Sequence, residues 1–294
     1  MSKLKAKPFL KWAGGKRQLL PEIRKHYPTP SKTKYIEPFV GGGAVLFDIL
    51  NEFDLTEVHI CDKNEQLINT YLAIRDHLEE LLFLLEGWQK DYYKCSNDGE
   101  RKALFSEIRN YYNVYTTRFE LAHPESDAFS ASMFIFLNKT CFNGLYRVNS
   151  KGEFNTPFGN YKNPLICDKE NLIAVSKALQ TNHNVDIFCG DYTSCANYID
   201  ENTFVYLDPP YTPLSKTSSF TSYTKDKFNK EEQLRLAEFM REMKGRGASV
   251  LLSNSSAESN LDIYKGFEVE RVVARRNISS DKNKRGLIEE FLVY

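Results

Sequence analysis

The sequence lacks the features that mark membrane, secreted and metal-bound proteins. No apolar run in its 294 residues approaches the roughly 18 residues that a membrane helix needs. The Lys-rich N-terminus is followed by no apolar segment of the kind that a secretory signal requires. The six cysteines form no CxxC pair and no Cys/His group with zinc spacing. We therefore expect an intracellular (cytoplasmic) chain without disulfides or a metal.

The sequence also has no net charge, since 39 Lys and Arg face 39 Asp and Glu. The total therefore gives no general attraction to nucleic acid. The distribution is uneven, because residues 1–36 carry ten Lys or Arg against Glu22, and residues 271–285 carry six against Asp281. Clustering on one face matters more for phosphate binding than the total. Taken alone, either run fits a solvated chain end equally well.

Alternating strand and helix patterns predict an α/β fold. Residues 35–39 and 58–61 have the pattern of strands, joined by a helix over 44–50, and such a βαβ unit implies a parallel sheet. The further expected elements are strands at 185–188, 204–207 and 248–252, a helix at 230–243, and an antiparallel pair at 267–274 and 287–294. The chain is thus expected to form a doubly wound, mostly parallel sheet.

Residues 64–165 interrupt this alternation. Apolar residues over 67–85 recur at helical spacing and predict one long amphipathic helix. A turn at 150–153 predicts a β-hairpin at the end of the segment. We expect residues 64–165 to form an inserted helical and β-hairpin subdomain, and residues 1–63 and 166–294 to form the main domain.

The motif Asp208-Pro209-Pro210-Tyr211 follows the buried strand expected at 204–207. In an open α/β sheet, ligands bind beyond the carboxyl ends of the strands. Neither proline has an N–H, so the backbone here offers carbonyl acceptors without competing donors. A carboxylate, a free carbonyl and an aromatic ring together suit a planar base that carries an amino group. A Pro-rich turn with Tyr211 as packing would have the same sequence.

The turn at 41–43 (GGG) opens a helix, whose N-terminal N–H groups favour an anionic group. Glycines at Gly41 and Gly43 also allow a ligand to approach the backbone closely. Asp62 ends the next strand about 20 residues on, where a carboxylate accepts hydrogen bonds from ribose hydroxyls. The turn does not match GxGxxG, so an adenosine-type cofactor is favoured over a dinucleotide. A tight turn with a solvated Asp is the alternative.

Two further segments are candidates for ligand contact. Asp191 follows the strand expected at 185–188 and can accept a hydrogen bond from an adenine amino group, although a strand-end Asp is often purely structural. The run from Trp12 to Lys16 (WAGGK) combines two glycines with a cation for a carboxylate. A flexible basic N-terminus is the alternative for that run.

Three motifs occur in a fixed order along the chain, namely residues 9–16 (FLKWAGGK), 37–43 (EPFVGGG) and 208–211 (DPPY). With them the chain resembles the Dam-type DNA adenine-N6 methyltransferases, the α-group enzymes that use S-adenosylmethionine. The similarity covers nearly the whole chain and extends to residues 143–147 (NGLYR), 154–159 (FNTPFG) and 275–280 (RRNISS).

The resemblance implies a methyltransferase fold in which residues 64–165 form a target-recognition insertion. It implies S-adenosylmethionine as cofactor and double-stranded DNA as partner. The implied catalytic residues are Asp208, Pro209 and Tyr211. The implied cofactor-binding residues are Trp12, Lys16, Phe39, Gly41, Gly43, Asp62, Asp191 and Asp208.

The chemistry of adenine agrees with this assignment. The N6 lone pair is delocalised into the ring and is a poor nucleophile. Hydrogen bonds from the amino protons to the Asp208 carboxylate and the Pro209 carbonyl would localise that lone pair toward a sulfonium methyl group. In-line transfer then needs no covalent enzyme intermediate. The target base must leave the duplex, and Tyr211 offers it a stacking surface.

The insertion is expected to read the DNA sequence. Arg147 can pair bidentately with the major-groove edge of a guanine. Leu145 and Pro157 can touch thymine methyl groups, and Lys11 can contact the outer guanine. These positions resemble those of enzymes that read GATC, so we expect methylation of adenine in 5′-GATC-3′.

Other residues are expected to hold the DNA. Phe142 can wedge into the base stack, and Asn143 can contact the orphaned thymine. The family commonly has Tyr at the wedge position, so Phe142 loses any phosphate contact made by a hydroxyl. Arg275 and Arg276 are expected to contact phosphates, unless they are simply solvated.

Two other classes of function remain open at this point. One is an RNA adenine or protein amide methyltransferase, although related amide-modifying enzymes favour Asn at the position of Asp208. The other is a sequence-specific DNA-binding protein without catalysis, which would not need Asp208 and Lys16. A monomer is expected for this class, and the role in restriction-modification, a phage or housekeeping stays open.

Overall fold

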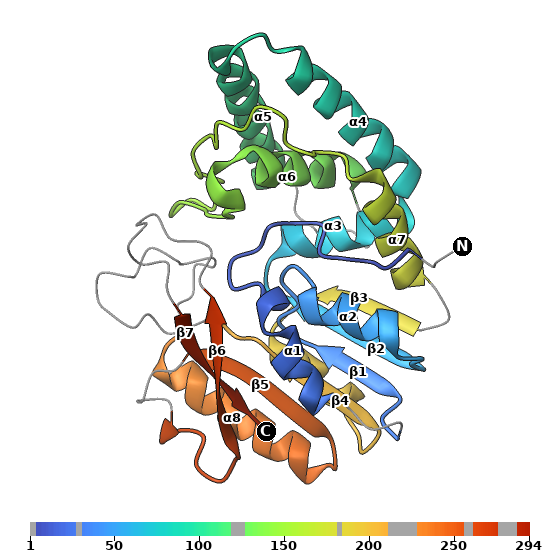
Figure 1. The fold of residues 1–294 in the computed structure, drawn as a ribbon, viewed down its shortest axis with the longest axis vertical. Helices are drawn as coiled ribbons and strands as arrows, with labels where there is room; N and C mark the ends of the chain where they lie inside the picture. The colour runs from blue at the N-terminus through green and yellow to red at the C-terminus, as the bar shows by residue number, and fades with distance from the viewer. Residues whose placement is uncertain are drawn as a thin grey trace.

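One sheet forms the centre of the protein (Figure 1). The computed structural model describes residues 4–27, 31–118, 127–180, 184–210, 228–255, 261–275 and 287–294. The strands are β1 (Lys34–Glu37), β2 (Glu57–Asp62), β3 (Asn184–Cys189), β4 (Thr203–Leu207), β5 (Ser249–Ser255), β6 (Val269–Arg275) and β7 (Leu287–Val293). Within the described ranges they form a seven-stranded sheet in the order β3-β2-β1-β4-β5-β7-β6.

The helices lie on both faces of the sheet and in a separate group at one end of it (Figure 1). The α-helices are α1 (Leu20–Ile23), α2 (Ala44–Glu52), α3 (Glu65–Asp76), α4 (Leu78–Lys94), α5 (Asp98–Arg118), α6 (Ala128–Thr140), α7 (Lys169–Gln180) and α8 (Lys230–Gly245). Short 3-10 helices are η1 (Lys16–Gln18), η2 (Arg24–His26), η3 (Phe142–Gly144) and η4 (Tyr192–Tyr198). None of these helices is long and apolar enough to cross a membrane.

The strand pairing confirms the expected mostly parallel α/β sheet. β1 pairs in parallel with β2 and β4, β2 with β3, and β4 with β5. β7 lies antiparallel between β5 and β6, which confirms the antiparallel pair expected at the end of the chain. Because the parallel strands share one direction, their carboxyl ends meet at one edge of the sheet.

Side-chain alternation along the strands produces two hydrophobic layers. On β1, Tyr35 packs with the layer under α2, α3 and α7, whereas Ile36 packs with the layer under α8 and η4. β4 alternates in the same way, with Phe204 facing the first layer and Val205 the second. The sheet is therefore covered on both faces, as its apolar strands require.

Helix starts follow from local capping. Asn64, Asp127 and Asn229 each precede a helix, and each side chain accepts a backbone N–H from the first turn at 2.9–3.0 Å. Such caps satisfy donors that have no partner inside the helix. The expected helix after Asn229 is thereby confirmed.

The helices within residues 64–165 differ from expectation at one place. The single helix expected over 67–85 is wrong, because the chain breaks at His77 (φ −128°, ψ 36°) into α3 and α4. Both helices pack against α6 and α7, but the break allows α3 to lie on β2 and β3 as well. No Pro or Gly marks this site, so the apolar spacing runs through it undisturbed.

The expected hairpin is present as a short antiparallel pairing. Val148 bridges Phe154, and the Asn149 N–H donates to the Glu153 carbonyl at 2.9 Å. The core around α4 and α6 is continuous with the layer that covers the sheet, since Leu85 and Phe136 belong to the same buried cluster as Tyr71. The hairpin is thus attached to the sheet through a packed interior.

Asn138 of α6 fastens the N-terminal segment to the hairpin. Its side chain accepts the Lys11 N–H at 2.9 Å and donates to the carbonyls of Lys11 at 2.8 Å and Gly144 at 2.9 Å. Asn138 is only 3% exposed, so water cannot replace these bonds.

Replacing Asn138 should therefore destabilise the protein. Asn138→Ala removes the partner of three backbone groups, one buried and two part-buried, and we expect a loss of about 2–4 kcal/mol in the free energy of unfolding. Urea unfolding measures the loss. Asn163→Ala, at an exposed asparagine, is the matched control and should be neutral. Equal stability of the two variants would contradict the assigned role of Asn138.

Candidate active site

The expected site residues gather along the edge where the parallel strands end. Asp208 directly follows β4, and the glycine turn at 41–43 follows β1. Asp62 ends β2, and Asp191 lies two residues after β3. Since β3, β2, β1 and β4 are neighbours in that order, these groups form a row along the edge of the sheet.

An ion pair between Lys16 and Asp208 lies at the β4 end of this row. Lys16 Nζ is 2.8 Å from Asp208 Oδ1 and also donates to the Gly14 carbonyl at 2.7 Å. The Lys16 side chain is 3% exposed and that of Asp208 is 20% exposed, so the pair is sheltered while the Asp208 side chain remains partly exposed. Burial raises the pKa of Asp208 to about 6, although Lys16 acts in the opposite direction.

The glycine turn packs closely against the side chains of Trp12 and Tyr71. Gly43 has φ +71°, and a Cβ there would lie 2.5 Å from the Tyr71 hydroxyl. At Gly41 (φ +48°) a Cβ would lie 2.8 Å from the Trp12 indole. Trp12 therefore occupies the space that the missing side chain leaves free, and the turn is closely packed on that side.

Asp62 holds the same turn from the other side. Its carboxylate accepts the N–H groups of Gly41 at 3.1 Å and Asn64 at 2.9 Å. Burial raises the pKa of Asp62, although these backbone donors oppose the shift. The carboxylate is thus fixed in place at the end of β2.

Asp191 already has cationic partners. Lys63 Nζ and Arg235 Nη2 each lie 2.9 Å from its carboxylate, and the Thr193 N–H and hydroxyl donate to it as well. Burial acts to raise the pKa of Asp191, but Lys63 and Thr193 outweigh it and lower that pKa to about 2. A contact to adenine has to compete with these partners, and it stays a prediction.

Phe39 packs with the hydrophobic layer on the α8 side of the sheet, opposite the layer that contains Trp12. Its ring centroid is 5.4 Å from that of Tyr192 and 6.0 Å from that of Phe228. Phe39 is half-buried beside these rings, so part of its side chain remains exposed. Its expected contact with the cofactor stays a prediction.

The residues expected to read DNA gather on and around the hairpin. Arg147 is exposed, and its guanidinium donates from Nε to Asn155 Oδ1 at 2.7 Å and from Nη2 to the Asn155 carbonyl at 3.0 Å. Phe142 is 43% exposed and donates its N–H to the carbonyl of Pro157, itself exposed, at 2.8 Å. Leu145 is half-buried nearby.

Two more of these residues lie close to the hairpin. Asn143 adopts a left-handed conformation (φ 56°) within η3. A Cβ on Gly144 would lie 2.5 Å from the Lys11 side chain, so Lys11 packs directly on this turn. The Lys11 ammonium sits 4.5 Å above the Tyr161 ring. The structure thus brings an N-terminal lysine to the hairpin, as the expectation for Lys11 requires.

Three expected residues lie wholly or partly outside the part of the chain that the structure describes. Tyr211 and Arg276 lie outside the described residues, and the side chain of Arg275 is likewise not described. Their roles stay predictions.

Sequence reasoning missed the aromatic contact that joins the two halves of the site. Trp12 stacks on Tyr146 of the hairpin, with ring centroids 5.8 Å apart and planes at 18°. Tyr146 precedes Arg147 directly, so one ring stack links the glycine turn to the hairpin. The signal was an aromatic residue beside each motif, which by itself does not identify a partner.

Two acids near Asp208 were also missed. Glu37 is 2% exposed and accepts the Tyr35 hydroxyl at 2.7 Å, and burial raises the pKa of Glu37 well above its usual value. Glu290 of β7 lies with its carboxylate 3.9 Å from Lys16 Nζ. Adjacent Glu289 and Glu290 in an apolar strand were a signal, because alternation turns one of them inward.

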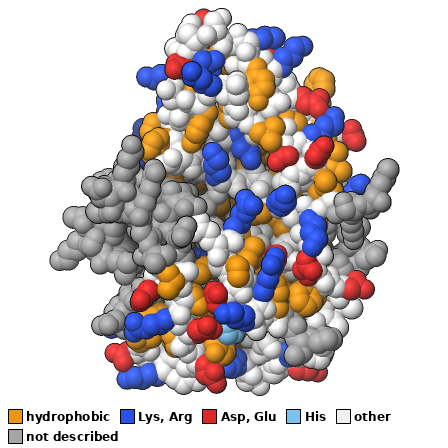
Figure 2. All heavy atoms as spheres, in the orientation of Figure 1, with side chains coloured by type: hydrophobic (Ala, Val, Ile, Leu, Met, Phe, Trp, Pro, Cys, Tyr) orange, Lys and Arg blue, Asp and Glu red, His pale blue; other side chains and the backbone are white. Residues whose placement is uncertain are grey.

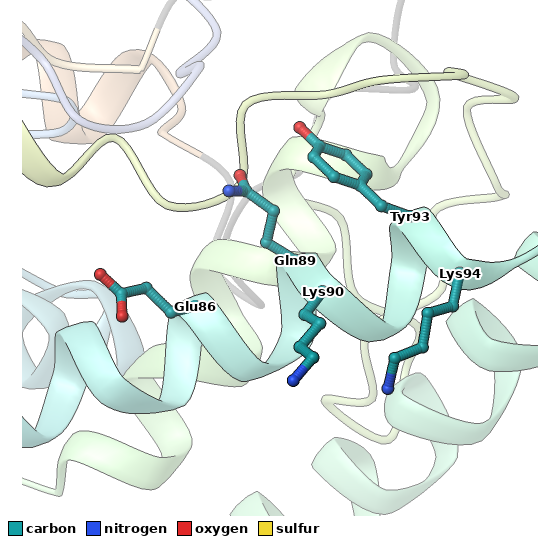
Figure 3. Close-up of a pocket in the computed structure, with 5 residues that line it drawn as sticks. All are labelled: Glu86, Gln89, Lys90, Tyr93 and Lys94. Atoms are coloured by element: carbon teal, nitrogen blue, oxygen red, sulfur yellow. The ribbon is translucent and has the colours of Figure 1, made fainter.

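A separate hollow of about 500 Å³ lies on α4 (Figure 3). It is lined by Glu86, Gln89, Lys90, Tyr93 and Lys94, all from the same helix. Gln89 accepts the N–H groups of Ile166 and Cys167 at 3.0 and 3.1 Å, so part of this surface already binds the chain itself. None of the expected site residues lines the hollow.

The family model for D12 class N6 adenine-specific DNA methyltransferases matches residues 12–278. The chain belongs to this family. This chain is 45% identical to the type II methyltransferase M.MjaIII of Methanocaldococcus jannaschii, over 97% of this chain and 98% of that protein. It is 37% identical to the type II methyltransferase M1.LlaDCHI of Lactococcus lactis subsp. cremoris, over 99% and 96% of the two chains. It is also 34% identical to the DNA adenine methylase of Escherichia coli K12, over 98% and 95%.

Family membership and the fold imply S-adenosylmethionine as the methyl donor and DNA as the substrate. The sheet edge suits such a donor, because the carboxylates of Asp208 and Glu290 lie 2.8 and 3.9 Å from a single ammonium group, that of Lys16. A ligand with a sulfonium and an ammonium group would relieve this excess of acid. In the described ranges, no group of three or more His, Cys, Asp or Glu side chains is placed to hold a metal ion.

The packing of the glycine turn can be tested by substitution. Gly43→Ala forces a side chain into a left-handed conformation and against the buried Tyr71, so we expect a loss of about 2–4 kcal/mol in stability. Gly87→Ala, in the open middle of α4, should instead stabilise the protein by up to about 1 kcal/mol. Urea unfolding compares the two, and an unaffected Gly43→Ala protein would refute this packing.

Proposed function

We propose that this enzyme transfers a methyl group to N6 of adenine in double-stranded DNA, at 5′-GATC-3′. The observation that supports it most directly is the partly exposed Asp208 side chain, held at 2.8 Å by the buried Lys16 and followed by Pro209 at the end of β4. A rigid anion beside a backbone carbonyl, at the edge where ligands bind, suits an amino group as substrate.

Asp208 and Pro209 each supply one hydrogen-bond acceptor for the N6 amino group. The carboxylate accepts a hydrogen bond from one amino N–H and the Pro209 carbonyl accepts one from the other, which concentrates the lone pair on N6. S-adenosylmethionine supplies an electrophilic methyl group on sulfur. In-line transfer then depends mainly on how well these two acceptors orient the base. The ionised carboxylate is the stronger acceptor, so the pKa of Asp208, raised by burial to about 6, places the onset of activity near pH 6.

The cofactor site is proposed to extend along the row of strand ends. Trp12, Phe39, Gly41 and Gly43 would surround the ligand, and Lys16 and Asp208 would face its reactive end. Asp62 is positioned by two backbone donors to accept ribose hydroxyls. Asp191 is proposed at the adenine end, with Lys63 and Arg235 as competing partners.

The adenine has to leave the duplex to reach Asp208. Extrusion costs a few kcal/mol, and stacking on an aromatic ring returns roughly 1–3 kcal/mol per base. Tyr211 is proposed as that ring, and Phe142 as the side chain that enters the vacated space. The 43% exposure of Phe142 supports the second assignment, because an apolar ring so exposed is available to stack on bases.

Residues 64–165 are proposed to recognise the target, and the remaining residues to carry out transfer. Arg147 is held by Asn155 with its guanidinium exposed, which suits a bidentate contact to guanine. Leu145 and Pro157 would contact thymine methyl groups, Lys11 the outer guanine and Asn143 the orphaned thymine. Arg275 and Arg276 are proposed as phosphate contacts.

The surface charge supports a nucleic-acid partner on one face. Figure 2 shows Lys and Arg side chains gathered along the middle of that face, over the N-terminal segment of Figure 1. Lys7, Lys11 and Arg17 of this segment are exposed. Such a row attracts a phosphate backbone even though the whole chain has no net charge. We propose that one copy of the chain acts on the duplex.

Replacing Asp208 tests the catalytic assignment. Asp208→Asn keeps the shape of the side chain but loses the anion, so we expect the single-turnover rate to fall at least about 100-fold. The measurement follows tritium from labelled S-adenosylmethionine into a GATC duplex and a scrambled duplex. Asp262→Asn, at an exposed aspartate, is the control and should keep full activity. Transfer at the normal rate by Asp208→Asn would rule out the mechanism.

The same assay separates the alternatives. Wild-type transfer to the GATC duplex and not to the scrambled one supports the proposed target. Equal transfer to both duplexes would contradict GATC specificity, and transfer to neither duplex would contradict DNA as the substrate.

Arg147→Ala tests sequence reading. Without its guanidinium the enzyme should lose about 1–3 kcal/mol of discrimination at one guanine of the site, measured as the ratio of kcat/KM for GATC and a duplex with that guanine replaced. Lys151→Ala, at the exposed tip of the same hairpin, should leave this ratio unchanged. Wild-type discrimination by Arg147→Ala would show that another residue reads the guanine.

A further inference from the structure

Lys16 has two carboxylates within reach of one ammonium group. Its Nζ lies 2.8 Å from Asp208 Oδ1 and 3.9 Å from Glu290 Oε2. Lys16 is 4% exposed and Glu290 is 9% exposed, so water screens this arrangement poorly. The nearer carboxylate belongs to the motif proposed to bind adenine, and the farther one has no assigned role.

Glu290 is held at this distance by the sheet. β7 lies between β5 and β6, and Glu290 pairs with Ser255 on one side and Val272 on the other. Its neighbour Glu289 points the other way, with a side chain 56% exposed and 3.6 Å from Arg271. The strand therefore presents one glutamate to Lys16 and the other to solvent.

The adenine amino group and Lys16 are both hydrogen-bond donors, and both need the Asp208 carboxylate. When the substrate arrives, the lysine and the amino group share the two oxygens of one carboxylate, and the hold of Asp208 on Lys16 weakens. A second anion 3.9 Å away gives the ammonium group a place to move without leaving its charge unpaired.

We propose that Glu290 is a positioning residue that shares Lys16 with Asp208 and takes over the lysine when Asp208 binds the amino group of the target base. This inference rests on the proposed function. It predicts a role for Glu290 in the rate of transfer and in its dependence on pH, and no direct contact with substrate.

The pH dependence follows from the groups that face Asp208 in the described part of the chain. These are Lys16 from η1, Glu290 from β7, Glu37 from β1 and Tyr206 from β4. Burial raises the pKa of Asp208 most, Lys16 lowers it, and the negative charge of Glu290 raises it further. Removing that charge should make Asp208 easier to ionise, so activity should begin at a lower pH.

The test compares Glu290→Gln with Glu289→Gln. Single-turnover transfer to a GATC duplex is measured from about pH 5 to pH 9, with saturating cofactor. For Glu290→Gln we expect the acidic limb of the profile to move down by about half a pH unit or more, and the plateau rate to fall at least about fivefold. Glu289→Gln should match the wild type in both respects. An unmoved limb or an unchanged plateau in Glu290→Gln would overturn the proposal.

A second variant guards against a folding defect, because Glu290 is buried. Thermal unfolding and cofactor binding identify a variant that fails to fold. Glu290→Asp keeps the charge but withdraws it from Lys16, so the plateau should fall while the limb stays near its wild-type position. A normal plateau in this variant would also overturn the proposal.

The outcome is separable from that of the proposed function. If Asp208→Asn loses transfer while the Glu290→Gln profile is normal, this inference fails and the function stands. If Asp208→Asn retains transfer, the function itself fails.

Discussion

The ion pair between Lys16 and Asp208 is the constraint on which the site depends. It joins the N-terminal segment to the end of β4, two parts of the chain separated by nearly 200 residues of sequence. Because both groups are sheltered, neither tolerates the loss of its partner easily. Lys16 favours the anionic form of Asp208, although burial favours the neutral acid. The pair also fixes the run from Trp12 to Lys16 beside the glycine turn, where Trp12 packs on Gly41.

The rest of the site is built outward from that point by packing. Trp12 fills the space beside Gly41, Tyr146 stacks on Trp12, and Arg147 follows Tyr146 on the exposed side. Asn138 ties the backbone of Lys11 to the turn at Gly144. Recognition and chemistry are proposed for different segments, yet these contacts make the two segments one continuous structure.

Much of this could be predicted from the sequence, because strand-end motifs are local. A buried apolar run followed by Asp208 specifies both the strand and the position of the acid, and the same holds for Asp62. The break at His77 could not be predicted, because helix spacing continues through it and the cause is the different packing of α3 and α4. The inward turn of Glu290 depends on where β7 enters the sheet, and no local pattern distinguishes it from Glu289.

The stack of Trp12 on Tyr146 has a practical consequence for spectroscopy. The chain has two tryptophans, and the other, Trp88, donates its indole N–H to Ser132 within the helical insertion. In a Trp88→Phe protein, intrinsic fluorescence would come from a single indole wedged between the glycine turn and the hairpin. Emission from that ring would respond both to ligands along the sheet edge and to DNA against the hairpin, giving an optical signal for each without any attached dye.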